Sequence, residues 1–482
     1  MTGSTNPRNW LSRRPRLCQY RKNRSIMTTS KSFVLNSIRM SKTFRYMSRF
    51  DGRVALVLTL LLLVPCRATA VFTIEIKEGV EAGIPIAVVP FGLQGVDGLE
   101  HLPADIIQSD LGISGKFEPI SRNSFLSRPT DLKSVQYKDW RLIKAEVLVV
   151  GKVINIGNGQ YEVRFRLIDV FRERQLVGQK FLVPMNRLRR VSHQISDLIY
   201  QHFTGKPGAF DTKIAYVHVE GEDPDRVFKL QIADSDGYNP KTVLQSSQPI
   251  LSPAWSPDGN WISYVSFERK RSMIYVQNVW SGERELISEF QGINSAPAWS
   301  PDGRRLAITL SKDGNPDIYI YSRDDGSLRR MTTHPAIDTE ASFSPDGRML
   351  VFASGRAGPP QIYEMSVAGG EPRRLTTGQY NAGPSYSPDG KTIVLITDQG
   401  NGFRVGIYSN EDRTGTVKEL TDTTQDESPA FAPNGEMIIY ATQQGGKSLL
   451  AVVSTDGSVK QTLRFQQGSV REPVWSPFNR KL

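Results

Sequence analysis

One pentapeptide recurs at nearly constant intervals along the second half of the chain. "WSPDG" at 255–259 returns at 299–303, and "FSPDG", "YSPDG", "FAPNG" and "WSPFN" follow at 343–347, 386–390, 431–435 and 475–479. The starts lie 44, 44, 43, 45 and 44 residues apart. Self-similarity at about 40–45 residues is typical of a propeller blade or a comparable array. The spacing therefore predicts a repeat protein with six units.

Each pentapeptide reads as a tight turn between two strands. Its aromatic residue ends an apolar strand, its Pro presets φ for the turn, and its Gly supplies the positive φ that closes the loop. Two strand-like segments follow each turn, for example "RLAITL" (305–310) and "DIYIYS" (317–322), and a short last strand comes after a Gly-bearing turn. Each unit therefore holds four short antiparallel strands.

The two ends of the array complement each other. Residues 212–246 resemble the second, third and fourth strands of a unit, whereas "REPVWSP" (471–477) resembles a first strand with nothing after it. Pairing them closes a ring and leaves no free sheet edge, while an open array would need polar caps at both ends. We predict an all-β six-bladed propeller over residues 206–482, with four-stranded antiparallel blades and closure by the C-terminal strand.

Residues 71–205 lack the repeat and predict a small α/β domain. "IPIAVVPF" (84–91) is a continuous apolar strand, and "PADIIQSDLGIS" (103–114) has helical spacing. Residues 145–156 and 161–170 flank the turn "GNGQ" as a hairpin, and residues 187–203 form an amphipathic helix.

The formal net charge of +11 comes from a leader. Residues 1–70 hold 14 of the 60 Lys and Arg residues and a single acid, while the remainder carries 46 basic and 48 acidic residues. The basicity therefore gives no reason to expect nucleic-acid binding by the folded protein.

The leader ends in a signal-peptide pattern. An 11-residue apolar stretch (54–64) is followed by Ala68 and Ala70, the small residues of a cleavage site. We expect a mature N-terminus at Val71, no transmembrane segment in the mature chain, and a periplasmic location. A retained anchor and a lipoprotein at Cys66 are the alternatives. Initiation at Met47 would give a signal of ordinary length, with residues 1–46 an over-extended reading frame.

The sequence lacks the usual signatures of catalysis. Both cysteines, Cys18 and Cys66, lie in the leader, the five histidines are scattered, and G-x-S-x-G and H-E-x-x-H motifs are missing. We expect no enzyme activity, no cofactor and no metal site. A propeller enzyme of the lactonase or peptidase type and a peptidoglycan-binding module are the competing hypotheses.

A closed ring offers one natural concave binding surface, its mouth. Connections into the innermost strands and loops between the second and third strands open on the same face, where loops carry function. A solvated polar rim is the alternative. The candidate partner-binding residues are Asn294, Asp338, Thr339, Glu340, Asn381, Asp426, Glu427, Arg471 and Glu472.

The signal, the "IPIAVVPF" strand, "GAFDTKIAYV" (208–217), "DGYNPKTVLQSSQPILSPAWSPDG" (236–259) and "VVSTDG" (452–457) resemble the TolB family, periplasmic propellers of the bacterial Tol–Pal envelope system. The resemblance covers essentially all of residues 71–482. It implies a non-enzymatic adaptor, monomeric apart from its partners, that supports outer-membrane integrity and cell division.

The resemblance also implies two partners. The propeller mouth of family members binds the peptidoglycan-associated lipoprotein Pal, and "DTE" (338–340) and "IN" (293–294) fall on loops used for that contact. The first mature residues bind TolA, which places Val71, Phe72, Ile74 and Ile76 in the second site. The alternation of residues 71–77 independently suits edge pairing with another sheet.

Overall fold

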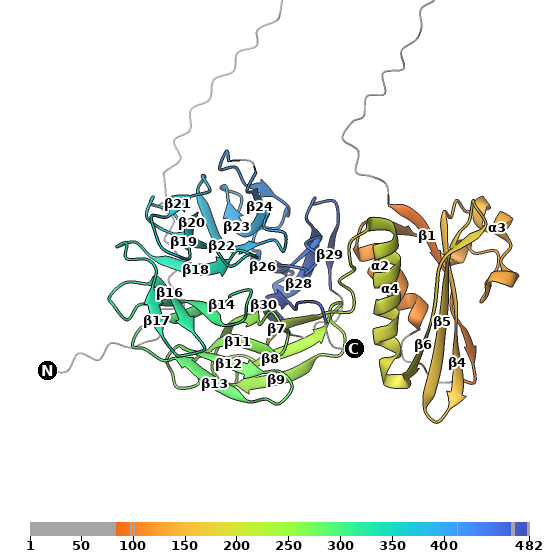
Figure 1. Ribbon diagram of the computed structural model, residues 1–482, viewed down its shortest axis with the longest axis horizontal. Helices are drawn as coiled ribbons and strands as arrows, with labels where there is room; N and C mark the ends of the chain where they lie inside the picture. Colours follow the sequence, from red (N-terminus) through yellow and green to blue (C-terminus); the bar gives the residue numbers. More distant parts are fainter. Residues whose placement is uncertain (1–82, 97–98, 100–101, 412, 464–467, 480–482) are drawn as a thin grey trace, which may run out of the picture. The chain divides into compact units, whose positions relative to one another are not determined.

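The structure, a computed structural model, describes residues 83–96, 99, 102–411, 413–463 and 468–479 (Figure 1). In this part the chain forms a small α/β domain and then six four-stranded antiparallel sheets. The predicted fold class, a six-bladed propeller preceded by a small α/β domain, is confirmed.

The α/β domain is built on one mixed sheet. Its strand order is β3-β1-β4-β5-β6, with β2 beside β4, and β1 runs parallel to both of its neighbours. The long strands β4, β5 and β6 form an antiparallel meander. The strands are β1 (Ile84–Val88), β2 (Gly92–Gln94), β3 (Phe117–Pro119), β4 (Val147–Gly157), β5 (Gln160–Asp169) and β6 (Arg174–Pro184).

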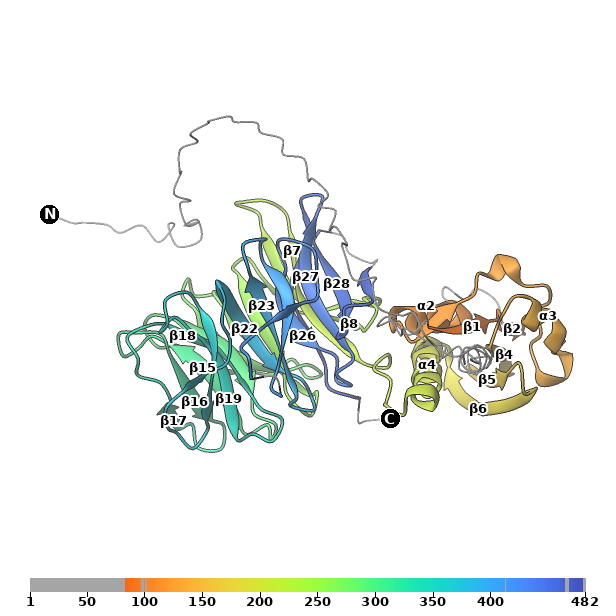
Figure 2. The same ribbon diagram turned by 90° about the horizontal axis from the view of Figure 1, so that it is seen from above.

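Helices cover both faces of this sheet (Figure 2). One face packs against α2 and α4, where Ile107 and Ile195 are fully buried. The other face packs against Trp140 of α3. The helices are α2 (Pro103–Ile113), α3 (Tyr137–Leu142) and α4 (Leu188–Thr204), with 3-10 turns η2 (Arg122–Ser124), η3 (Leu132–Ser134) and η4 (Met185–Arg187).

The six blades follow in chain order, and each is given from its innermost strand outward. Blade 1 is β30 (Ser469–Trp475), β7 (Lys213–Glu220), β8 (Val227–Asp234) and β9 (Lys241–Ser246). Blade 2 is β10 (Ile250–Trp255), β11 (Trp261–Ser266), β12 (Met273–Asn278) and β13 (Arg284–Ser288). Blade 3 is β14 (Asn294–Trp299), β15 (Arg305–Leu310), β16 (Asp317–Ser322) and β17 (Leu328–Arg330).

The second half of the ring has the same order. Blade 4 is β18 (Asp338–Phe343), β19 (Met349–Ser354), β20 (Gln361–Ser366) and β21 (Arg373–Arg374). Blade 5 is β22 (Tyr380–Tyr386), β23 (Thr392–Asp398), β24 (Arg404–Ser409) and β25 (Lys418–Glu419). Blade 6 is β26 (Glu427–Phe431), β27 (Met437–Gln444), β28 (Lys447–Ser454) and β29 (Lys460–Thr462).

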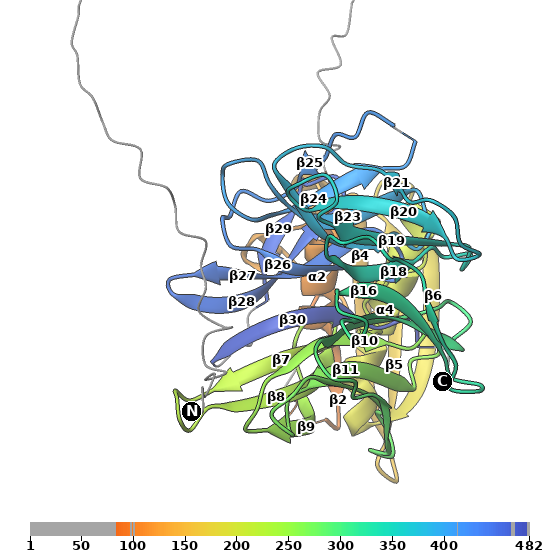
Figure 3. The same cartoon turned by 90° about the vertical axis from the view of Figure 1, so that its left-hand side faces the viewer.

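The ring closes by pairing strands from the two ends of the propeller. Figure 3 shows β30 lying beside β7, and their antiparallel register aligns Val470 with His218 and Trp475 with Ile214. The Trp475 indole Nε1 donates to Thr212 Oγ1 at 2.8 Å. Closure therefore rests on main-chain pairing reinforced by a side-chain hydrogen bond.

The repeated pentapeptide is a hydrogen-bonded turn. In the first copy Ser256 Oγ donates to Asp258 Oδ1 at 2.5 Å, and the Trp261 amide donates to Ser256 Oγ at 2.9 Å. Gly259 has a φ of 69°, which a β-carbon would strain. The repeated Asp is thus part of the turn.

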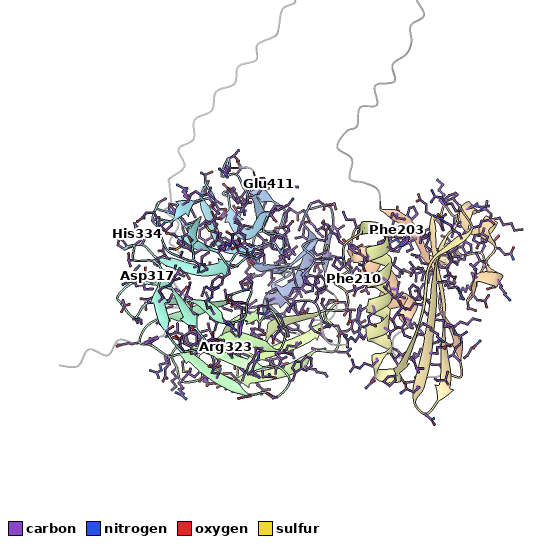
Figure 4. All side chains as sticks on the ribbon, viewed as in Figure 1. Phe203, Phe210, Asp317, Arg323, His334 and Glu411 are labelled. Carbon is purple, nitrogen blue, oxygen red and sulfur yellow. The ribbon has the colours of Figure 1, made fainter. Side chains whose placement is uncertain are left out.

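Blades are also joined through their side chains. Arg323 follows β16 and is labelled in Figure 4; its guanidinium lies 5.2 Å from the ring centre of Trp261 and 5.1 Å from that of Trp299. The two rings belong to blades 2 and 3, so one cation bridges both.

Removing the closing strand tests the role of closure. We expect deletion of residues 469–482 to lower the unfolding midpoint by at least about 10 °C and to cause aggregation, because the inner edge of β7 becomes unpaired. Differential scanning calorimetry and light scattering measure both effects. Deletion of residues 480–482 alone is the matched control; equal stability of the two variants would contradict strand closure.

Candidate functional site at the propeller mouth

The structure divides the predicted mouth residues into two groups. Asn294, Asp338 and Asn381 are fully buried, and Asp426 is 3% exposed. Thr339 and Glu472 are partly buried, whereas Glu340, Glu427 and Arg471 are exposed. The prediction that all nine side chains surround the opening is therefore wrong for Asn294, Asp338, Asn381 and Asp426.

Two of the four buried side chains, those of Asn294 and Asn381, attach an innermost strand to the preceding blade. Asn294 Oδ1 accepts a hydrogen bond from Ser288 Oγ at 2.6 Å, at the end of β13. Asn381 Nδ2 donates to Gln361 Oε1 of β20 at 2.9 Å. Each side chain turns into the protein and holds two blades together, which explains its burial.

The other two buried side chains are carboxylates with close partners. Asp426 accepts a hydrogen bond from Thr421 Oγ1 at 2.5 Å, which joins blades 5 and 6. Asp338 Oδ2 lies 2.8 Å from Nη2 of Arg356, which follows β19 in the same blade. Loss of either carboxylate would disturb the ring itself, so neither side chain is available to a partner.

A β-bulge in each innermost strand positions the accessible residues. The pairing with the second strand shifts register in every blade, for example between Thr339 and Ser342. One residue per bulge has a left-handed backbone; these are Ser252, Ala296, Glu340, Gly383, Ser428 and Glu472, with φ between 48° and 62°. Bulges next to functional sites redirect side chains, and non-glycine residues rarely take this conformation.

The sequence analysis did not identify these bulges, although a signal was present. Pro occurs two residues before the aromatic of the pentapeptide in five of the six repeats, and the left-handed residue directly precedes it. The exception is Ala341, after Glu340. Aligning the repeats would therefore have singled out the left-handed position.

Carboxylates from three blades converge at these bulges. Glu340 Oε2 accepts a hydrogen bond from the Gly383 amide at 2.8 Å, and the Glu472 carboxylate accepts one from the Ser252 amide. In both cases a carboxylate reaches the left-handed residue of the next blade. Glu427, one position before a left-handed residue, adds a further negative charge.

The surroundings raise the pKa of all three carboxyls. Although both side chains keep contact with solvent, desolvation by the surrounding ring raises the pKa of Glu340 and of Glu427, and the Gly383 amide and Arg471 respectively oppose the change. Burial raises the pKa of Glu472 to about 7, and the charges of Glu427 and Glu340 add to the effect. The site therefore holds closely spaced acids, with Arg471 as a neighbouring cation.

Four exposed apolar side chains occur in connections at the same end of the blades as this acidic site, and of these four residues only Ile293 was named from the sequence. Ile293 and Ile337 directly precede β14 and β18 and are 40% and 55% exposed. Phe290 and Phe403 are 44% and 42% exposed. The Ser311 amide donates to the Ile293 carbonyl, so the loop after β15 lies against the residue that leads into β14. We call these four residues, with Glu340, Glu427, Arg471 and Glu472, the mouth surface.

A different group of side chains has the composition of a metal site. Ligand atoms of Asp110, His193 and Asp236 lie within 4.8 Å of one another. His193 Nδ1 is 2.8 Å from Asp110 Oδ2, and Asp236 is paired with Arg189. Burial lowers the pKa of His193, but the Asp110 carboxylate outweighs it and raises that pKa to about 9. Asp110 and Asp236 therefore already have protein partners, His193 and Arg189 respectively.

Several predictions fall outside the described residues. They are the cleavage site at Ala68 and Ala70 and the proposed TolA contacts Val71, Phe72, Ile74 and Ile76. Within the described ranges, no helix has both the length and the apolar character needed to cross a bilayer.

Two family models match the chain. The model described as TolB beta propeller domain matches residues 200–479, and the model described as TolB amino-terminal domain matches residues 72–176. The crystal structure of TolB from Acinetobacter baumannii superposes with a TM-score of 0.75 at 43% identity, covering 82% of this chain and 97% of that one.

Relatives of known description agree. The Tol-Pal system protein TolB of Xanthomonas oryzae pv. oryzae (strain PXO99A) is 47% identical over 422 residues, which cover 86% of this chain and 96% of that protein. The protein of the same description from Nitrosococcus oceani is 49% identical over 228 residues, 47% of this chain. That match spans 52% of the relative, so the chain covers about half of its length.

A closed ring of six four-stranded blades that follows a small α/β domain defines the class of protein to which the chain belongs. The resemblance noted in the sequence is confirmed by both domains and by full-length relatives. The chain belongs to the TolB family of Tol–Pal system proteins.

The raised pKa of Glu472 predicts a pH-dependent stability. The folded state holds this proton more tightly than the unfolded chain, so the wild type loses stability as pH rises from about 4.5 to about 7. We expect Glu472→Gln to leave the free energy of unfolding nearly unchanged at pH 4.5 and to raise it by about 1–3 kcal/mol at pH 8. Urea titrations at the two pH values measure the difference.

Glu371→Gln is the control, because Glu371 is exposed in the turn between β20 and β21, at the opposite end of its blade from the mouth surface. An increase in the free energy of unfolding at pH 8 that is equal for both variants, or no increase for Glu472→Gln, would contradict the raised pKa assigned to Glu472 in this acidic site.

Proposed function

We propose that this protein is a periplasmic adaptor that binds a Pal-like peptidoglycan-associated lipoprotein at its mouth surface and TolA through residues 71–82. In this role it supports outer-membrane integrity and cell division. The family assignment and the full-length relatives described as Tol-Pal system proteins support the proposal.

The observation that carries the proposal is the composition of the mouth surface. Ile293, Ile337, Phe290 and Phe403 expose apolar area at the same end of the blades as the acidic site formed by Glu340, Glu427 and Glu472. Protein interfaces combine an apolar, aromatic-rich centre with a polar rim, and large exposed apolar groups on a soluble surface mark contact sites. The rigid ring holds both features in fixed positions, which lowers the entropy cost of binding.

The second contact is inferred from the sequence of residues 71–82. "VFTIEIKEGVEA" alternates apolar and polar residues at its start, as a strand added to the edge of another sheet does. In such a complex the main chain supplies the hydrogen bonds and alternate side chains supply the specificity.

Reversing one charge at the mouth surface tests the first contact. We expect Glu340→Lys to weaken binding of the Pal-like lipoprotein at least about tenfold, because a cation replaces a carboxylate at the centre of the contact. Isothermal titration calorimetry measures the affinity, and thermal melting checks the fold.

Glu371→Lys is the matched control: it makes the same charge change in the same blade, at the end that bears the pentapeptide turn. Retention of wild-type affinity by Glu340→Lys would place the lipoprotein elsewhere. Binding of purified peptidoglycan by the mature chain alone would favour a polymer-binding module instead.

Changing alternate residues of the N-terminal segment tests the second contact. We expect serine substitution of Phe72, Ile74 and Ile76 to abolish TolA binding and to leave lipoprotein binding unchanged, since one side of the added strand loses its apolar contacts. The control replaces Thr73, Glu75 and Lys77 with serine. Equal loss of TolA binding in both variants, or none in either, would argue against strand addition.

A further inference from the structure

On the sheet face that packs against α3, the side chains change in character along the strands. Leu148 and Val150 of β4 and Ile168 of β5 pack on this face beneath Trp140 of α3. Because side chains alternate along a strand, Lys152 of β4 and Arg164 and Arg166 of β5 follow on the same face. Along this face the side chains change from buried and apolar to cationic.

Three cations of this face stand in register across neighbouring strands. Lys152 of β4 is aligned with Arg164 of β5, and Arg164 is aligned with Lys180 of β6. Like charges directly opposite one another destabilise a sheet. A row of like charges therefore departs from the usual cross-strand pairing, and departures of this kind concentrate at functional sites.

Carboxylates of the domain offset the row only in part. Asp131 Oδ2 lies 2.9 Å from Lys152 Nζ, and Glu162 pairs with Arg164 and lies 4.0 Å from Lys180 Nζ. The exposed fractions of the side chains rise from 22% for Lys152 to 57% for Arg164 and 76% for Lys180. The positive charge is therefore most accessible toward β6.

A groove of about 330 Å³ lies beside the row and is also cationic. Lys133, Lys152, Arg164 and Arg166 line it, together with the carboxylate of Asp131. Arg166 donates to the neutral Gln175 Oε1. Among the described residues, no carboxylate lies within ion-pair distance of Lys133 or Arg166. The face therefore attracts negative charge.

The row ends at a long strand that is paired on one side. In the described sheet β6 is the terminal strand and pairs with β5, and its 11 residues exceed the usual strand length of about 5–6. An open edge presents main-chain donors and acceptors to another chain. A second polypeptide strand satisfies these groups along their length, whereas a phosphate or a lipid headgroup does not.

We propose that β6 and the cationic face beside it form a second docking surface, which binds an acidic polypeptide segment in extended conformation. The segment adds a strand to β6 and places a carboxylate next to Lys180, so that the row Lys152, Arg164, Lys180 ends in an opposite charge. Arg164 and the cations of the groove lie farther from the added strand and attract its acidic side chains through space. This surface does not involve the mouth surface or residues 71–82.

A designed peptide tests this surface without knowledge of the natural partner. The probe is a twelve-residue peptide that alternates Glu and Thr, which puts every carboxylate on one side of an added strand. A peptide alternating Gln and Thr keeps the backbone and removes the charge. Calorimetry with the mature chain at low and high salt measures affinity, and amide hydrogen exchange reports protection along β6.

We expect the acidic peptide to bind more weakly as salt rises and to slow amide exchange in β6. Its affinity for the double variant Arg164→Gln, Lys180→Gln should be at least about tenfold lower than its affinity for the wild type. The matched control is Arg172→Gln, Arg187→Gln, which removes two exposed positive charges of the same domain from outside the row. This control should bind as the wild type does.

Three results would overturn the proposal. The first is equal affinity of the protein for the Glu and Gln peptides, or an equal loss of affinity for the Glu peptide in the row variant and in the control variant. The second is binding without protection of β6, which would exclude strand addition. The third is binding of phosphatidylglycerol vesicles, lost in Arg164→Gln, Lys180→Gln, with no binding of the peptide. That result would assign the surface to a membrane.

Discussion

The innermost strands of six blades converge on one channel, and this crowding governs the rest of the propeller. In every blade a bulge with one left-handed residue, at Ser252 and its five equivalents, interrupts the pairing of the innermost strand with the second strand, and the pairing continues on both sides of it. Because a bulge bends its strand and increases its twist, the same feature also sets the direction of nearby side chains such as Glu340 and Glu472. Fold and candidate site therefore share one backbone feature.

This arrangement separates structural from accessible polar residues by position. Two residues before the left-handed position, Asn294 and Asp338 are buried, whereas at that position Glu340 is exposed and Glu472 partly so. These positions could not be told apart from the sequence. The repeat period specifies which strand a residue occupies, while the local twist decides whether its side chain turns inward. Beyond the bulge the alternation of inward and outward side chains is offset by one residue, so a strict two-residue alternation assigns the wrong side to these residues.

The regular parts of the fold were predictable because local signals repeat. The second strands "WISYVS" and "RLAITL" coincide with β11 and β15, and the pairing of "REPVWSP" with the strand at 213–220 followed from the incomplete ends. The α/β domain has one copy of each element. Its edge strand β6 contains Gly178 and mostly exposed residues, and α3 has six residues, so neither carries a strong periodic pattern. The exposed apolar residues Ile337 and Phe403 were not among the predicted mouth residues, because those candidates were chosen for their polar side chains.

Strand β30 also imposes an order on the folding of the chain. Val470 pairs with His218, so blade 1 has its second, third and fourth strands from the start of the propeller and its first from the far end. A chain that leaves the ribosome or a translocation channel N-terminus first makes β7 long before β30. Until the last strand arrives, β7 keeps an open edge, and loop closure over such a separation is slow. During that interval the unpaired edge of β7 is open to wrong pairing.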